Sequence, residues 1–169
     1  MSSRGYFGVA VYNPKHETNV GLLWRTAVAY DAAFLATVGG TRYKRQHSDT
    51  PDSQRHTPLH HYTDIDDLIA HLPHECDLVG VEIAPTAVSL DRYAHRPRAL
   101  YLLGAEDHGL PAEVMRRCRD IVTVPTQRDF SLNVSVAGSI VLSHRHMARQ
   151  TRRRADLVPI AMPKLRSQP

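Results

Sequence analysis

The sequence predicts an α/β fold with a mainly parallel sheet and helices on both of its faces. Three observations predict it. Short apolar runs of strand length alternate with stretches of helical periodicity. The runs are almost continuously apolar, as strands buried on both faces are. Each run then breaks into glycine, proline or polar residues, and the loops that follow parallel strands form the ligand-binding crevice of open α/β sheets.

The first part of the chain has the pattern of strand, helix, strand. Asn13-Pro14 ends the first strand and Gly39-Gly40 ends the second. Thr18 or Asn19 can cap the helix, whose apolar residues recur at helical spacing. The expected ranges are Tyr6–Tyr12 for the first strand, a helix that runs to about Tyr30, and Ala33–Val38 for the second strand.

A polar segment, residues 41–61, interrupts this alternation. It carries Arg42, Lys44, Arg45 and Arg55 together with two prolines. We expect a long surface loop here, because such segments in compact domains are usually functional or disordered.

The second half resumes the alternation and ends in a long helix. Thr63-Asp64-Ile65-Asp66 resembles a capping box, and Pro111 suits the first turn of a helix. The expected elements are a helix up to Leu72, strands Asp77–Ile83, Tyr101–Leu103 and Ile121–Val124, a helix Ala112–Arg117 and a helix from Asn133 to about Arg152. We expect one domain, residues 1–155, and a surface or disordered tail, residues 156–169.

Size and composition fit one soluble domain. The chain has 169 residues, of which 42% are hydrophobic and 22% charged. No apolar stretch approaches the roughly 20 residues that span a bilayer, and the N-terminus leads into a strand-like run without a signal peptide. Cys76 and Cys118 form no CxxC pair. We therefore expect a reduced, cytoplasmic setting and no membrane contact.

The charge balance is basic, at +4, which favours an anionic partner such as nucleic acid. An arginine stripe that includes Arg145 and Arg149 lies near the end of the last helix. The stripe either complements the helix dipole or, with the basic residues of 41–55, contacts a phosphate backbone. The histidine pairs lack the spacing of a zinc site, so no metal is expected.

Three segments carry the candidate site residues. The first opens the first helix, where Asn19 and Arg25 are either a cap and a solvated cation or ligands for phosphate or hydroxyl. In the second, Gly104 and Gly109 flank Glu106, either in a tight turn or in a site lined by backbone amides.

The third segment contains Ser131 and Asn133, which precede a run of small residues. They either cap the last helix, whose small residues then pack closely, or face a ligand at its N-terminus. The chain has neither a GxGxxG at the first helix nor a GxxxxGK[ST]. Their absence argues against a nucleotide-binding oxidoreductase and a P-loop enzyme.

Together the motifs Asn-x-Gly-x-x-x-Arg, Leu-Gly-x-Glu-x-x-Gly-Leu and Ser-Leu-Asn-Val-Ser-Val-Ala resemble the SpoU (TrmH-like) branch of the SPOUT RNA methyltransferases, over roughly residues 6–149. The resemblance implies S-adenosylmethionine as methyl donor and a ribose 2′-hydroxyl of tRNA or rRNA as acceptor. It also implies a SPOUT fold with a C-terminal trefoil knot, and a homodimer.

The resemblance also implies roles for individual residues. The implied catalytic residues are Asn19, Arg25, Glu106, Ser131 and Asn133. The implied cofactor contacts are Val81, Gly104, Glu106, Gly109, Val124, Leu132 and Asn133. The expected RNA contacts are Arg25, Arg42, Lys44, Arg45, Arg145 and Arg149.

One segment departs from the family pattern. Residues 126–130 read Thr-Gln-Arg-Asp-Phe, where many relatives carry a glycine and one more residue. Two alternatives to the ribose methyltransferase stay open. One is an enzyme of the same fold that methylates a base, and the other is a non-catalytic RNA-binding or assembly factor.

Overall fold

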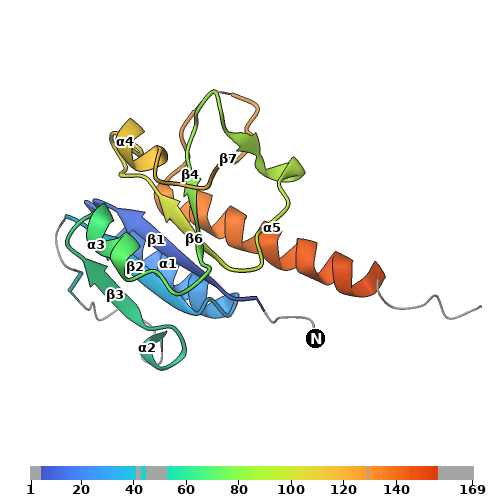
Figure 1. The fold of residues 1–169 in the computed structure, drawn as a ribbon, viewed down its shortest axis with the longest axis horizontal. Helices are drawn as coiled ribbons and strands as arrows, with labels where there is room; N and C mark the ends of the chain where they lie inside the picture. The colour runs from blue at the N-terminus through green and yellow to red at the C-terminus, as the bar shows by residue number, and fades with distance from the viewer. Residues whose placement is uncertain (1–4, 41–42, 45–52, 129, 156–169) are drawn as a thin grey trace, which may run out of the picture.

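The computed structural model describes residues 5–40, 43–44, 53–128 and 130–155 (Figure 1). The expected RNA contacts Arg42 and Arg45, and the expected tail, residues 156–169, lie outside the described residues. The described elements are β1 Phe7–Tyr12, α1 Glu17–Ala29, β2 Phe34–Val38, α2 Ser53–His56, β3 Leu59–Tyr62, α3 Ile65–Ala70, β4 Asp77–Val81, β5 Val88–Ser89, the 3₁₀ helix η1 Leu90–Arg92, β6 Ala99–Leu103, α4 Ala112–Met115, β7 Asp120–Thr123 and α5 Val134–Ala155.

Within the described residues, seven strands form one sheet in the order β3-β2-β1-β6-β4-β7-β5. All pairings between these strands are parallel. In the centre of the sheet, Val11 of β1 lies opposite Thr37 of β2 and Leu103 of β6. The expected mainly parallel α/β sheet is confirmed, and the trefoil knot stays a prediction.

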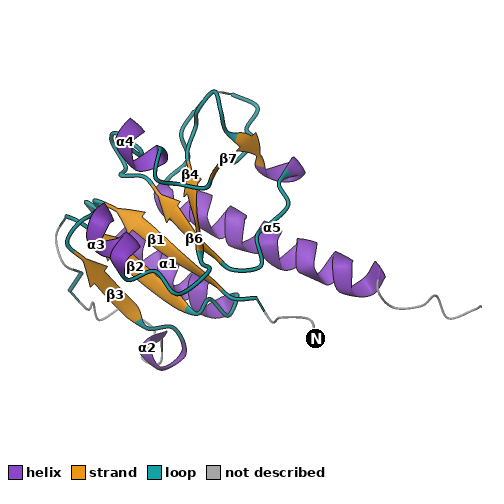
Figure 2. Ribbon diagram, in the orientation of Figure 1, coloured by secondary structure: helices purple, strands orange, loops and turns teal. Residues whose placement is uncertain are grey.

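Two apolar cores lie on the two faces of the sheet, because successive strand residues point to opposite sides. On one face, Val9 and Tyr101 pack against Leu23 of α1 and Val141 of α5. On the other face, the alternate strand residues pack against Leu68 of α3 and Val114 of α4. Helices therefore cover both faces of the sheet (Figure 2).

Small residues let α1 and α5 pack closely. A Cβ added to Gly138 of α5 would stand 2.6 Å from a methyl group of Leu23. Beside it, the hydroxyls of Thr26 and Ser139 are hydrogen-bonded at 2.9 Å. Gly138 and Ser139, in the run of small residues after Asn133, therefore allow the close contact between these two helices.

The structure adds elements that the apolar pattern does not predict. In the segment expected to be a loop, α2 and β3 are formed, and β3 pairs with β2 at the edge of the sheet. The buried Trp24 donates its indole N–H to the carbonyl of Thr57 at 2.8 Å, which fixes this segment to α1. An edge strand needs no continuous apolar run, and the sequence of β3, Leu-His-His-Tyr, has none.

Two predicted helix caps are wrong. His16 is the N-cap of α1, and Asn19 lies buried inside the first turn. Asp64, one residue after Thr63, is the N-cap of α3, and its carboxylate accepts from the N–H of Asp67 at 2.9 Å.

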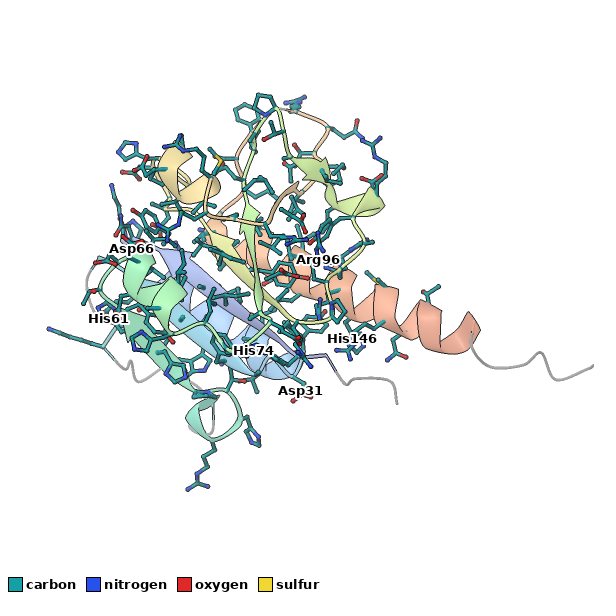
Figure 3. All side chains as sticks on the ribbon, in the orientation of Figure 1. Asp31, His61, Asp66, His74, Arg96 and His146 are labelled. Atoms are coloured by element: carbon teal, nitrogen blue, oxygen red, sulfur yellow. The ribbon has the colours of Figure 1, made fainter. Side chains whose placement is uncertain are left out.

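Arg145 is not an RNA contact, contrary to expectation, because its side chain is only 2% exposed. Its guanidinium donates to the carbonyls of Arg96 at 2.7 Å and Pro97 at 2.9 Å, and to the hydroxyl of Tyr101 at 3.0 Å. Arg96 lies beside α5 in Figure 3. Arg145 follows the buried Val141 by four residues and so falls on the core face of the helix.

Candidate functional site

Loops that follow three strands meet at the carboxyl edge of the sheet and enclose a pocket of about 270 Å³. These loops follow β4, β6 and β7, and the start of α5 forms the remaining wall. The pocket brings together most of the cofactor contacts expected from the sequence and two of the expected catalytic residues, Glu106 and Ser131. They are Val81, Gly104, Glu106, Gly109, Val124, Ser131 and Leu132.

Sequence reasoning missed several residues of the pocket. They include Glu82, Ile83, Ala105, Phe130, Val134 and Ala137. Glu82 is the residue that a search for ligand groups should find, since it is the first polar residue after the buried strand β4. The sequence analysis did not identify Glu82 as a pocket residue, because the strand was expected to continue to Ile83 and ends at Val81.

The loop between β6 and α4 closes on itself through its two glycines. Ala105 and Gly109 exchange backbone hydrogen bonds at 3.2 and 3.0 Å. Gly109 has a φ of +62°, and a Cβ there would stand 2.3 Å from a carboxylate oxygen of Glu82. A Cβ on Gly104 would collide with the backbone of Gly109. Both glycines therefore give the loop its shape and place its backbone against the pocket.

Glu82 holds two walls of the pocket together. Its carboxylate accepts from the N–H of Ile83 at 2.9 Å and from the N–H of Leu110 at 2.6 Å. Ile83 follows β4 and Leu110 precedes α4, so one side chain links the two loops.

A hydrogen-bond network connects the three predicted motifs behind the pocket. The amide of Asn19 donates to the carboxylate of Glu106 at 2.8 Å, and the amide of Asn133 donates to the carbonyl oxygen of Asn19 at 3.0 Å. The side chain of Asn133 also accepts from the N–H of Ser135 at 2.9 Å and so caps α5. The structure thus brings Asn19 together with Glu106, 87 positions later, and with Asn133, 114 positions later.

Glu106 is held in its ionised form. Burial raises the pKa of its carboxyl, but hydrogen bonds from Asn19 and from backbone amides outweigh burial and bring the pKa below its ordinary value. One of these amides is that of Lys15, at 3.1 Å, and the ammonium of Lys15 pairs with the neighbouring Asp107. Glu106 is therefore an acceptor at neutral pH and not a proton donor.

Arg25, which the resemblance implies to be catalytic, does not line this pocket. It is exposed on α1 and lines a neighbouring groove of about 790 Å³ between α1 and α5. Val124 lines both the groove and the pocket, so the two spaces adjoin. Within one chain, Arg25 is thus next to the pocket but outside it.

The other expected RNA contacts lie apart from the pocket lining. Lys44 is exposed, and Arg149 is half-buried with its guanidinium 3.5 Å from the carbonyl of Gly5. Among the described residues, no group of three histidine, cysteine, aspartate or glutamate side chains is placed to hold a metal ion. No helix in the described part of the chain is long and apolar enough to span a bilayer.

The model of the SpoU rRNA methylase family matches residues 6–143 of the chain. The chain belongs to this family. The match includes all three motifs, and the resemblance stated from the sequence is therefore confirmed. No curated protein sequence matches the chain.

Several solved structures have the same fold. One concerns the 2-OH methylation of C/U34 on tRNA; it is 23% identical, covers 89% of this chain and 99% of its own, and has a TM-score of 0.70. The TrmH/SpoU tRNA modifying enzyme of A. aeolicus is 21% identical, covers 86% of this chain and 76% of its own, and has a TM-score of 0.76.

A third similar structure was determined with its cofactor. It is the SpoU methyltransferase AviRb of Streptomyces viridochromogenes in complex with AdoMet. It is 21% identical, covers 89% of this chain and has a TM-score of 0.70. The match spans only 60% of the AviRb chain. At these identities the likeness establishes the fold.

Proposed function

We propose that this SpoU family member transfers a methyl group from S-adenosylmethionine to a ribose 2′-hydroxyl of tRNA or rRNA. The observation that carries the proposal is the convergence of the three family motifs on one pocket and on the hydrogen-bond network behind it. Similar proteins support it, since one acts on a 2-OH of tRNA and another binds AdoMet.

The residues of the pocket fit S-adenosylmethionine, which supplies a methyl group activated on a sulfonium. Apolar side chains suit the adenine ring and the carbon chain of the cofactor, among them Val81, Leu103 and Val134. Carboxylates suit its positive charge, and Glu82, Glu106 and Asp107 line the same pocket.

The polar residues at the pocket hold the acceptor in position. Methyl transfer is an in-line displacement, so the hydroxyl oxygen must stay aligned with the methyl carbon at about 3–3.5 Å. Ser131 is exposed in the pocket lining and can hydrogen-bond the incoming ribose. Asn19, Glu106 and Asn133 stabilise the loops around it through their mutual hydrogen bonds.

Glu82→Gln is expected to raise the Kd for S-adenosylmethionine about tenfold. The amide group of glutamine can accept only one of the two backbone hydrogen bonds and leaves the other N–H unpaired. At saturating cofactor, kcat should change less than about threefold. Isothermal titration calorimetry measures the affinity, and Glu113→Gln, an exposed residue of α4 outside the pocket lining, is the control. An unchanged Kd would contradict the role of Glu82.

A second copy of the chain is part of the proposal. Four exposed apolar side chains line the groove between α1 and α5, namely Leu22, Val136, Ile140 and Met147. Exposed apolar patches mark protein interaction sites or ligand-binding grooves, and we propose the first for this groove. A twofold dimer through the groove is self-complementary and places Arg25 of each copy at the interface.

Arg25 is the residue that the dimer brings to the reaction. Its guanidinium stays charged at neutral pH and does not act as a base. We propose that Arg25 of one copy contacts the acceptor hydroxyl or its adjacent phosphate at the pocket of the other copy. Lys44 and Arg149, on the described surface, are further proposed RNA contacts.

The double substitution Val136→Glu and Met147→Glu is expected to convert the dimer into monomers. Both side chains are exposed in the groove, so the charges should leave the fold intact and oppose association. Sedimentation velocity at micromolar concentration should show a wild-type dimer and a variant monomer, with methylation reduced at least tenfold. A fully active wild-type monomer would contradict the dimer.

The position of the methyl group tests the proposed reaction. RNA from cells that lack this protein should lose a 2′-O-methyl group that the parent strain carries, and the purified protein should restore it. A methyl group restored to a base would indicate base methylation. No S-adenosylmethionine binding by calorimetry would favour an assembly factor. We further propose residues 1–155 as the catalytic domain and the cytoplasm as its place of action.

A further inference from the structure

Phe130 is the most exposed large apolar side chain of the described residues, at 71%, and it lines the cofactor pocket. Its ring makes no contact with another aromatic ring in the described part of the chain. Two other exposed apolar side chains line the same pocket, Ile83 at 57% and Leu132 at 37%. The mouth of the pocket therefore has an apolar rim.

The backbone of the loop holds Phe130 in this position. The carbonyl of Arg128 accepts from the N–H of Phe130 at 2.7 Å and from the hydroxyl of Thr126 at 2.6 Å. Both bonds meet at one carbonyl oxygen, three residues before Ser131. These bonds lie within residues 126–130, the segment that departs from the family pattern.

The geometry of a nucleotide explains what such a rim can bind. If the ribose 2′-oxygen reaches the pocket, the base on the adjacent carbon of the same sugar lies at the pocket mouth. In an A-form duplex the base is stacked and paired, whereas an unpaired nucleotide can turn its base onto an aromatic side chain. An exposed ring beside Ser131 offers that surface.

We infer that Phe130 stacks on the unpaired nucleobase of the acceptor nucleotide, with Ile83 and Leu132 completing an apolar seat. The inference rests on the proposed function and narrows its substrate to nucleotides in loops, bulges or single strands. The cofactor's adenine is better served by the buried apolar wall deeper in the pocket, where Val81, Leu103 and Val134 lie. A ring that is mostly in solvent is placed for a ligand that arrives from outside.

Variants of Phe130 test the stacking. The full-length protein is assayed with labelled S-adenosylmethionine and RNA from cells that lack it. Phe130→Ala and Phe130→Leu should raise the KM for RNA about tenfold or more, because leucine keeps apolar area but has no ring face. Phe130→Tyr should stay near the wild type. In all three variants kcat and the Kd for S-adenosylmethionine should change less than twofold. Val88→Ala, an exposed apolar residue outside the pocket lining, is the control.

An abasic acceptor isolates the base itself. Once the methylated nucleotide is mapped, an oligonucleotide with an abasic ribose at that position is compared with the intact RNA. The wild type should bind the abasic RNA more weakly than the intact RNA, by about the factor that separates Phe130→Ala from the wild type on intact RNA. The Phe130→Ala variant should bind both RNAs with the same Kd.

Each other outcome overturns the inference in its own way. A Kd for S-adenosylmethionine that rises together with the KM for RNA would place the ring on the cofactor, and dissociation of the dimer would place it between copies. A Phe130→Leu variant with normal KM would overturn the stacking alone, provided that the wild type methylates RNA. No transfer to RNA by the wild type would overturn the proposed function as well.

Discussion

Replacing Arg25 by alanine is expected to lower kcat for RNA methylation at least 100-fold and to leave the Kd for S-adenosylmethionine within about twofold. The separation follows from the structure, because Arg25 lines the groove between α1 and α5 and is not part of the pocket lining. Single-turnover methylation and calorimetry measure the two quantities. Arg25→Lys keeps the charge without the planar fork and should restore only part of the rate.

A mixed dimer shows whether Arg25 acts across the interface. Arg25→Ala lacks the guanidinium, and Glu106→Arg places a cation in the pocket, so each homodimer should be inactive. Co-expression of the two variants should give about a quarter of the wild-type activity, since half of the dimers then combine one intact pocket with one Arg25 from the other copy. No recovery would show that Arg25 acts on the pocket of its own chain. Undiminished turnover by Arg25→Ala would exclude the role altogether.

Replacing Arg145 by alanine is expected to lower the free energy of unfolding by about 3 kcal/mol or more. The substitution removes the donor from the carbonyls of Arg96 and Pro97 and from the buried hydroxyl of Tyr101, and it opens a cavity beside Phe7, whose ring lies 4.9 Å from the guanidinium. Urea denaturation followed by circular dichroism measures the change.

Arg149→Ala is the matched control, because this arginine lies one helical turn further along α5 and is half-buried. Its loss should cost less than about 1 kcal/mol. If Arg145→Ala instead kept its stability and lost affinity for RNA, the structural role assigned to Arg145 would be wrong.

The sequence predicted what depends on local pattern. The strands β1, β2, β4 and β6 follow from nearly continuous apolar runs, because strands buried on both faces are mostly apolar. The half-buried β7 follows from its short apolar run, Ile121-Val122. The pocket follows from the same logic. The loops after parallel strands meet at one edge, and residues of the second and third motifs lie in those loops.

The sequence did not predict features whose formation depends on tertiary contacts. β3 is recognisable only by its pairing with β2, since half of its residues are histidines. The sequence places Arg145 in a basic stripe, but in the structure it donates to the carbonyls of Arg96 and Pro97, which precede β6. The sequence pattern makes Asn19 a candidate helix cap, but in the structure its amide donates to the carboxylate of Glu106 at 2.8 Å. In each case the partner is distant in sequence, and no local pattern records it.

The position of Arg25 relative to the pocket could not be predicted from the sequence, because it depends on helix packing. Helical spacing places it nearly two turns beyond Asn19, but the direction of the side chain relative to the pocket depends on how α1 packs on α5. That packing depends on small residues such as Gly138, whose contact with Leu23 is visible only in three dimensions. The groove, and the dimer that we propose to cover it, follow from the same packing.

A crystal structure of the protein grown with S-adenosylhomocysteine tests the central claim most directly. We expect the ligand in the pocket between the loops after β4, β6 and β7, with Arg25 of a second copy at the pocket mouth. Ligand bound at another place, or a pocket that stays empty at saturating concentration, would contradict it.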